Sequence, residues 1–133
     1  MKKHSLLYIA FGLVVVLGTL HFIATAFYFY WTLWWFDNLM HFLAGLTGGF
    51  IAVWFLFDSG IFYKHPPTIS ESIWWALLFL VPVGIVWEIF EYVNGITQLF
   101  ESYTVDTLAD LFFDALGAIL AGVIGAKRLL KSF

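Results

Sequence analysis

From Ser5 to Ala26 the chain reads SLLYIAFGLVVVLGTLHFIATA, without a single Asp, Glu, Lys or Arg. At a rise of about 1.5 Å per residue, this stretch is long enough to cross a hydrocarbon core of roughly 30 Å. Its backbone groups would find no water in lipid, so it is predicted to be a helix. Three further apolar stretches follow, near residues 38–57, 73–92 and 107–126. We therefore predict an all-α membrane protein with a four-transmembrane-helix bundle.

The composition supports a single transmembrane domain over residues 1–133. Hydrophobic residues make up 62% of the chain and charged residues 11%, against about 25% charged residues in soluble domains. The 16 Phe and 7 Trp exceed what a soluble domain of this size can bury. Cysteine is absent, which excludes disulfides and thiolate metal sites. We find no phosphate-binding loop, no Ser-His-Asp set and no basic face for nucleic acid. Membrane lipids are the expected partners.

The first apolar stretch also has features of a secretory signal. Lys2 and Lys3 precede it, and Ala-Thr-Ala at residues 24–26 resembles a small-residue cleavage site. However, the aromatic residues 27–30 prolong the apolar run, as is typical of a membrane anchor. We expect this segment to be kept as a transmembrane helix.

The charged residues are sorted by side. With four spans, Lys2 and Lys3, Lys64 and the three C-terminal cations share one side, and no Lys or Arg falls on the other. The positive-inside rule predicts that both termini are cytoplasmic, in a multi-pass protein of the cell membrane. The acidic residues show the opposite bias. Seven of them are expected at or near the outer half: Asp37, Glu88, Glu91, Glu101, Asp106, Asp110 and Asp114.

Three of the predicted helices carry polar and small residues on one face. Residues three or four apart share a helix face, as Asp37 and His41 do. On these faces the polar residues of the outer halves are Asp37, His41, Glu88, Glu91, Asp106, Asp110 and Asp114. The small residues further in include Gly45, Gly48, Gly84, Gly117 and Ala121. Small residues let helices approach closely in lipid, so we expect the second and fourth spans to touch and the acidic halves to converge.

Converging carboxylates inside a membrane need compensation. A charged side chain at the centre costs on the order of 3 kcal/mol by insertion scales. Since no basic residue is available on that side, the carboxylates must be neutralised by protonation or by a bound cation. Carboxylate oxygens with an imidazole suit divalent Mg, Mn, Ca, Zn or iron. We therefore predict one divalent metal site formed by Asp37, His41, Glu88, Glu91, Asp110 and Asp114, with Asp106 as a rim ligand or helix cap.

Structural interpretations stand beside this one. Asp37 and Asp106 each begin a predicted helix and fit the role of an N-cap. Glu88 could belong to a helix end that reaches water, and His41 could be an interfacial histidine with its hydrogen bonds satisfied. His21, on the first span, is expected to hydrogen-bond inside the bundle rather than to bind a metal.

At the acidic residues and His41 of the predicted metal site, the chain resembles the VanZ-like membrane proteins and, more closely, the YjdF-like family. The VanZ-like pattern is Asp-Lys then His on one helix, Glu then Gln on the next, and Asp, Asn and Gly on the last. Three departures from it, at Asn38, Glu91 and Asp114, make the site more acidic, which favours a cation. The resemblance spans about residues 37–125 and links the chain to a family associated with glycopeptide-antibiotic resistance. The matched positions are Asp37, Asn38, His41, Glu88, Glu91, Asp110, Asp114 and Gly117.

Three functions remain open from the sequence. The first is a metal-dependent enzyme that acts on a lipid or lipid-linked substrate at the outer leaflet, where the metal would activate water or neutralise a phosphate. The second is a cation-binding or transport protein without catalysis. The third is a structural membrane protein whose carboxylates share protons.

Overall fold

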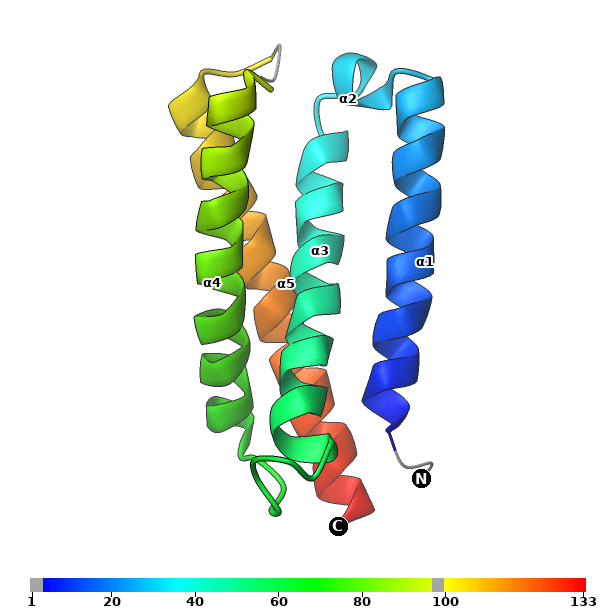
Figure 1. Ribbon diagram of the computed structural model, residues 1–133, viewed down its shortest axis with the longest axis vertical. Helices are drawn as coiled ribbons and strands as arrows, with labels where there is room; N and C mark the ends of the chain where they lie inside the picture. The colour runs from blue at the N-terminus through cyan, green and yellow to red at the C-terminus, as the bar shows by residue number, and fades with distance from the viewer. Residues whose placement is uncertain (1–3, 97–99) are drawn as a thin grey trace.

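The computed structural model describes residues 4–96 and 100–133, and every regular element in them is a helix (Figure 1). Four of these segments are long and apolar enough to cross a membrane, so the predicted all-α bundle is confirmed. The second span is continuous through a short π-helix, η1, that extends α3. The elements are α1 (Ser5–Ala26), α2 (Phe29–Thr32), α3 (Phe36–Val53), η1 (Trp54–Asp58), α4 (Ile69–Asn94) and α5 (Tyr103–Ser132).

The last two spans begin earlier than their apolar stretches do, because polar residues cap them. Thr68 precedes α4 and forms a capping box, in which its hydroxyl accepts from the N–H of Glu71 at 3.1 Å while the Glu71 carboxylate accepts from the N–H of Thr68 at 2.8 Å. Gly95 ends α4 with φ at 67°, a left-handed conformation that suits glycine. Ser102 caps α5 through its hydroxyl oxygen alone, which accepts from the N–H of Val105. Hydropathy does not detect such polar end turns.

The helices form a bundle in which α3 contacts each of the other three long helices. Figure 1 shows α5 crossing diagonally behind the others, and its main contacts are with α3 and α4, whereas α1 packs against α3. The described ends of the chain lie at one end of the bundle, together with the loop that carries Lys64. We call this the basic end, and the opposite end, where α2 and the α4–α5 connection lie, the acidic end. Lys2 and Lys3 fall outside the described residues.

The aromatic segment between the first two spans is partly helical. It contains α2, a single turn that starts after Tyr28, whose φ is 60°. The Tyr30 ring packs edge-on against the ring of Phe36, with 5.1 Å between centroids, and Phe36 is buried. The segment therefore closes the acidic end between α1 and α3.

Two glycines bring the backbones of α3 and α5 into direct contact, as expected. A Cβ added at Gly45 would overlap backbone atoms of Asp114, and one added at Gly117 would overlap backbone atoms of Phe42 and Leu46. No side chain could move to make room, because the obstacles are backbone atoms. Small residues thus set the distance between these helices.

The expected α3–α5 contact at Gly48 is wrong. A Cβ added there would lie 2.9 Å from the side chain of Leu80 on α4, so Gly48 faces α4. Its neighbour Gly49 faces α5 instead, since a Cβ at Gly49 would lie 2.6 Å from the Cβ of Ala121. The small-residue stripe of α3 therefore serves two helices rather than one.

Apolar side chains fill the basic half of the bundle. The cluster joins residues from all four spans, and most of them are less than 5% exposed. The acidic half has few such residues, and carboxylates and an imidazole occupy the interior there instead. The apolar cluster consists of Leu6, Ala10, Phe50, Val53, Phe57, Ala76, Leu80, Ala118, Ala121 and Leu129.

Candidate metal centre

His41 lies at the middle of the polar cluster at the acidic end. Its Nδ1 is 3.1 Å from Oδ1 of Asp114, and its Nε2 is 3.5 Å from Oδ2 of Asp110. The same Nε2 is 3.9 Å from Oδ2 of Asp37, one helical turn earlier. Both ring nitrogens therefore face carboxylates, and the side chain is only 8% exposed.

The close approach of the helices places these groups. Asp110 and Asp114 lie one turn apart on α5, on the face that Gly117 presses against α3. Gly84 of α4 leaves space for Asp114, because a Cβ there would lie 2.9 Å from Oδ2 of that carboxylate. The small residues of α4 and α5 thus lie where the helices pack closely around the acidic side chains.

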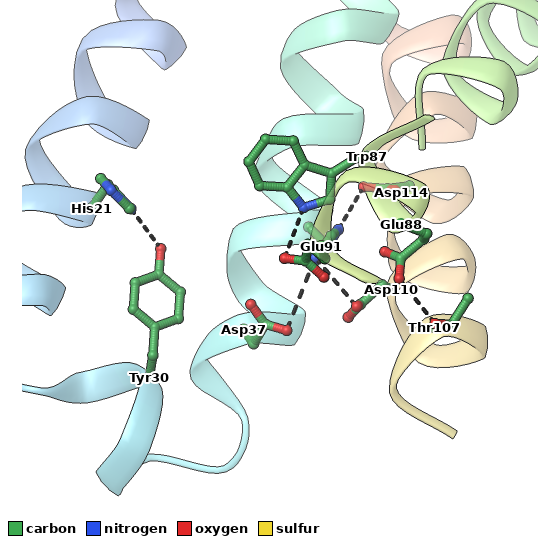
Figure 2. Close-up of polar contacts among 10 residues, drawn as sticks. His21, Tyr30, Asp37, Trp87, Glu88, Glu91, Thr107, Asp110 and Asp114 are labelled. Atoms are coloured by element: carbon green, nitrogen blue, oxygen red, sulfur yellow. Dashed lines mark hydrogen bonds and ion pairs between the residues drawn. The ribbon is translucent and has the colours of Figure 1, made fainter. Parts of the chain in front are cut away.

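Two glutamates from α4 complete the cluster, each held by one hydrogen bond (Figure 2). The hydroxyl of Thr107 donates to Oε2 of Glu88 at 2.9 Å. The indole Nε1 of Trp87 donates to Oε1 of Glu91 at 3.0 Å. Both glutamates are buried, at 4% and 7% exposed, so the alternative in which Glu88 reaches water at a helix end is wrong.

Asp110 is the least satisfied group of the cluster. It is fully buried, and neither of its carboxylate oxygens has a hydrogen-bond partner among the described residues. Oε1 of Glu88 is also buried without one. An unsatisfied buried polar group costs about 1–3 kcal/mol, and a charged one costs more. Asp110 therefore needs a ligand or a proton.

The described basic residues lie far from this cluster. Lys64 belongs to the loop at the basic end, and the three cations of α5 occupy its last turns at the same end (Figure 1). His41 is the one nitrogen base that the ion pairs of the described residues place against these carboxylates. A single imidazole cannot neutralise several carboxylates.

Two groups of ligand atoms share Asp110. In the first, one atom each from Asp37, His41 and Asp110 lie within 4.8 Å of one another. In the second, one atom each from Glu88, Glu91 and Asp110 do so. Oxygen ligands with one imidazole nitrogen match the preferences of Mg²⁺, Mn²⁺, Zn²⁺ and iron. The donor set therefore fits a divalent cation.

Asp114, a predicted ligand, and Asp106, a predicted rim ligand or cap, lie outside both groups of ligand atoms. Asp114 belongs to neither group and contacts the other ring nitrogen of His41. Metal-binding histidines commonly donate their second N–H to a carboxylate, which orients the ring. Asp106 is 8% exposed, in the first turn of α5. The N-cap interpretation is wrong for both Asp37 and Asp106, because Trp35 and Ser102 hold the cap positions.

Two openings lie beside the cluster. A narrow polar cleft contains Asp37 and Asp106 among its lining residues. An adjoining groove of about 380 Å³ shares Trp34 and Asn38 with the cleft and is mainly apolar. Glu101 also lines the cleft and is half-buried. The groove is lined by Trp34, Trp35, Asn38, Leu39, Phe42 and Phe113.

His21 lies apart from the cluster (Figure 2). Its Nδ1 is 3.0 Å from the hydroxyl of Tyr30 and its side chain is exposed, so the hydrogen bond is present but not inside the bundle. Burial, and then the nearby carboxylates of Asp37 and Glu91, raise the pKa of Tyr30 to about 12. The Tyr30 hydroxyl therefore stays protonated at neutral pH.

Sequence analysis missed the side chains that hold the two glutamates. Trp87 and Glu91 are four residues apart on one helix, so helical spacing could have suggested their contact. Thr107 reaches Glu88 from another helix, and Tyr103 donates to the Glu88 carbonyl oxygen at 3.1 Å. No sequence pattern indicates those two contacts.

The fold and the cluster define a multi-pass membrane protein with carboxylates and a histidine gathered at one end of its helices. A family model described as "Predicted membrane protein (DUF2238)" matches residues 2–131, and the chain belongs to that family. Neither the curated proteins nor the solved structures contain a match.

Proposed function

We propose that this membrane protein binds a divalent cation in the cluster around Asp110. The observation that carries the proposal is the fully buried Asp110 carboxylate, whose two oxygens have no hydrogen-bond partner among the described residues. A cation would give these oxygens a partner and would balance the neighbouring carboxylates. The alternative is a structural network in which the carboxylates share protons.

The proposal predicts metal in the purified protein. The parent is expected to contain a divalent metal by elemental analysis, and removal of it by a chelator is expected to lower the melting temperature. Added Mn²⁺ should restore it in a concentration-dependent way, because a ligand of the folded state stabilises that state. Acid pH should weaken binding, since protons compete for the same ligand atoms. A metal-free parent that ignores both chelator and added ions would leave the proton-sharing network.

We further propose that both termini are cytoplasmic in the cell membrane, with the acidic end outside. The six basic residues support this orientation through the positive-inside rule. A reporter that is active only outside the cytoplasm, fused after Phe133, is expected to stay silent. Activity of that fusion, with the protein intact, would reverse the orientation and place the cluster inside.

A metal-dependent enzyme of the outer leaflet is the second candidate function. The apolar groove supports it, because Trp34 and Asn38 connect the groove to the cleft that contains Asp37. A lipid chain in the groove would place a phosphate headgroup near the cation, which could polarise a phosphoryl oxygen or activate water. Release of phosphate from a lipid phosphomonoester by the Mn²⁺-loaded protein would distinguish this candidate. Uptake of Mn²⁺ by sealed vesicles would indicate transport instead.

We also propose kinship with the VanZ-like and YjdF-like proteins. The proposal rests on the short motifs that place Asp37, His41, Glu88 and Asp110 in the order of the VanZ-like pattern. These are residues that meet in the cluster, which is what a shared site would require.

A further inference from the structure

We propose that the cluster holds two divalent cations, with the Asp110 carboxylate as a bridge between them. This inference rests on the proposed function, because it needs cation binding at the same residues. It goes beyond that function by assigning the stoichiometry, the bridging ligand and the ligands of each ion.

The geometry points to a bridge because Asp110 belongs to both groups of ligand atoms. Asp37 and His41 belong to one group and Glu88 and Glu91 to the other. Asp110 has two oxygens, both fully buried and both without a hydrogen-bond partner in the described chain. Oδ2 lies 3.5 Å from Nε2 of His41, in the first group, so this oxygen could bind the first ion and Oδ1 the second. In two-metal sites the ions are about 3.5–4 Å apart, a distance that one carboxylate spans.

The second group has its own unsatisfied oxygen. Thr107 occupies Oε2 of Glu88, while Oε1 of that carboxylate is buried without a partner. An ion bound by the first group alone would not contact this oxygen, because Glu88 belongs only to the second group. A second ion between Glu88, Glu91 and Asp110 would satisfy it.

The charges favour two ions over one. The two groups together contain four carboxylates and the His41 imidazole. Two divalent cations would neutralise the four negative charges, whereas a single one would leave two charges uncompensated in a region without a described basic residue. Uncompensated charge in a low-dielectric interior is costly.

Hydrogen bonds from neighbouring side chains orient ligands of both proposed ions. Asp114 contacts Nδ1 of His41 and leaves Nε2 for the first ion. Trp87 and Thr107 each hold one oxygen of a glutamate at the second ion. Three of the five proposed ligands, His41, Glu88 and Glu91, are thus each oriented by a separate neighbour, as is common around metal sites.

The test is a Mn²⁺ titration of the metal-stripped full chain in detergent, followed by electron paramagnetic resonance. We expect two Mn²⁺ per chain and an exchange-coupled spectrum, because the ions would lie about 4 Å apart. Asp37→Asn and Glu91→Gln are each expected to reduce binding from two ions to one and to leave the uncoupled six-line signal. Asp110→Asn should weaken binding at both positions at least tenfold.

Glu71→Gln is the matched control, because it removes a carboxylate at the basic end while glutamine can still complete the capping box with Thr68. It should bind two ions. One uncoupled ion in the parent would overturn the two-ion site but leave the proposed cation site standing. No bound Mn²⁺ would overturn both. These readings come from the parent, so they hold even where a variant fails to fold.

Discussion

Asp110→Asn is expected to stabilise the protein without metal and to lose much of that advantage over the parent when the metal is added. Without metal the variant should be more stable than the parent by about 1–3 kcal/mol, since a neutral amide replaces a buried carboxylate that has no described hydrogen-bond partner. With Mn²⁺ at a hundred times its dissociation constant, the parent should gain about 2.7 kcal/mol and the variant much less. Melting curves with chelator and with Mn²⁺, together with metal content, measure both effects.

This dependence of the stability difference on metal separates the cation site from its structural alternative. In a proton-sharing network, Asp110→Asn would change stability by the same amount with and without Mn²⁺. A double variant, Asp110→Asn with Asp114→Asn, extends the test to the group that contacts His41. If the parent carries no metal, ignores chelator and Mn²⁺, and the double variant is more stable, the cluster is structural. Glu71→Gln, at the other end of the bundle, should respond to Mn²⁺ as the parent does.

Gly117→Leu is expected to cause a large loss of stability at the contact between α3 and α5. A Cβ alone at Gly117 would overlap the backbone of Phe42 and Leu46, so the two helices must separate. Overpacking of this kind costs at least about 1–3 kcal/mol. Because the same contact brings the carboxylates together, cation binding should weaken as well. Thermal unfolding in detergent and Mn²⁺ titration measure the two losses.

Gly12→Leu on α1 is the matched control for that substitution. A Cβ at Gly12 would have no described neighbour within 4 Å, and leucine has a better helix propensity than glycine. The melting temperature should therefore not fall. The melting temperature of Gly48→Leu should lie between those of Gly12→Leu and Gly117→Leu, because the added side chain would meet the flexible side chain of Leu80 rather than backbone atoms. An unchanged melting temperature for Gly117→Leu would show that the α3–α5 contact does not form.

Much of the site could be predicted because helical spacing is a local property. Asp37 and His41 had to share a face of one helix, as did Asp110 and Asp114, whatever the helices packed against. The absence of basic residues on that side was also visible in the sequence. The sequence did not show which acidic residues join the groups of ligand atoms and which contact His41. Asp114 turned out to contact Nδ1 of His41, while Asp110 alone joined two groups of ligand atoms.

The hydrogen bonds to the glutamates show why spacing was insufficient. Thr107 and Glu88 lie on different helices, so their contact depends on how far α5 is rotated and shifted relative to α4. That rotation results from all the side chains between the two helices. Gly48 and Gly49 show the same limit, since one residue of difference decided which of them faces α5.

Hydropathy and helical spacing were enough to establish four spans, because a backbone in lipid must satisfy its hydrogen bonds within each segment and needs about 20 apolar residues to cross. They were also enough to place acidic and small residues on common faces. Which faces meet, and therefore which carboxylate is buried without a partner, came from the packing of α3, α4 and α5. The physical reason is that a helix fixes the directions of its own side chains, whereas its contacts depend on the shape of every neighbour.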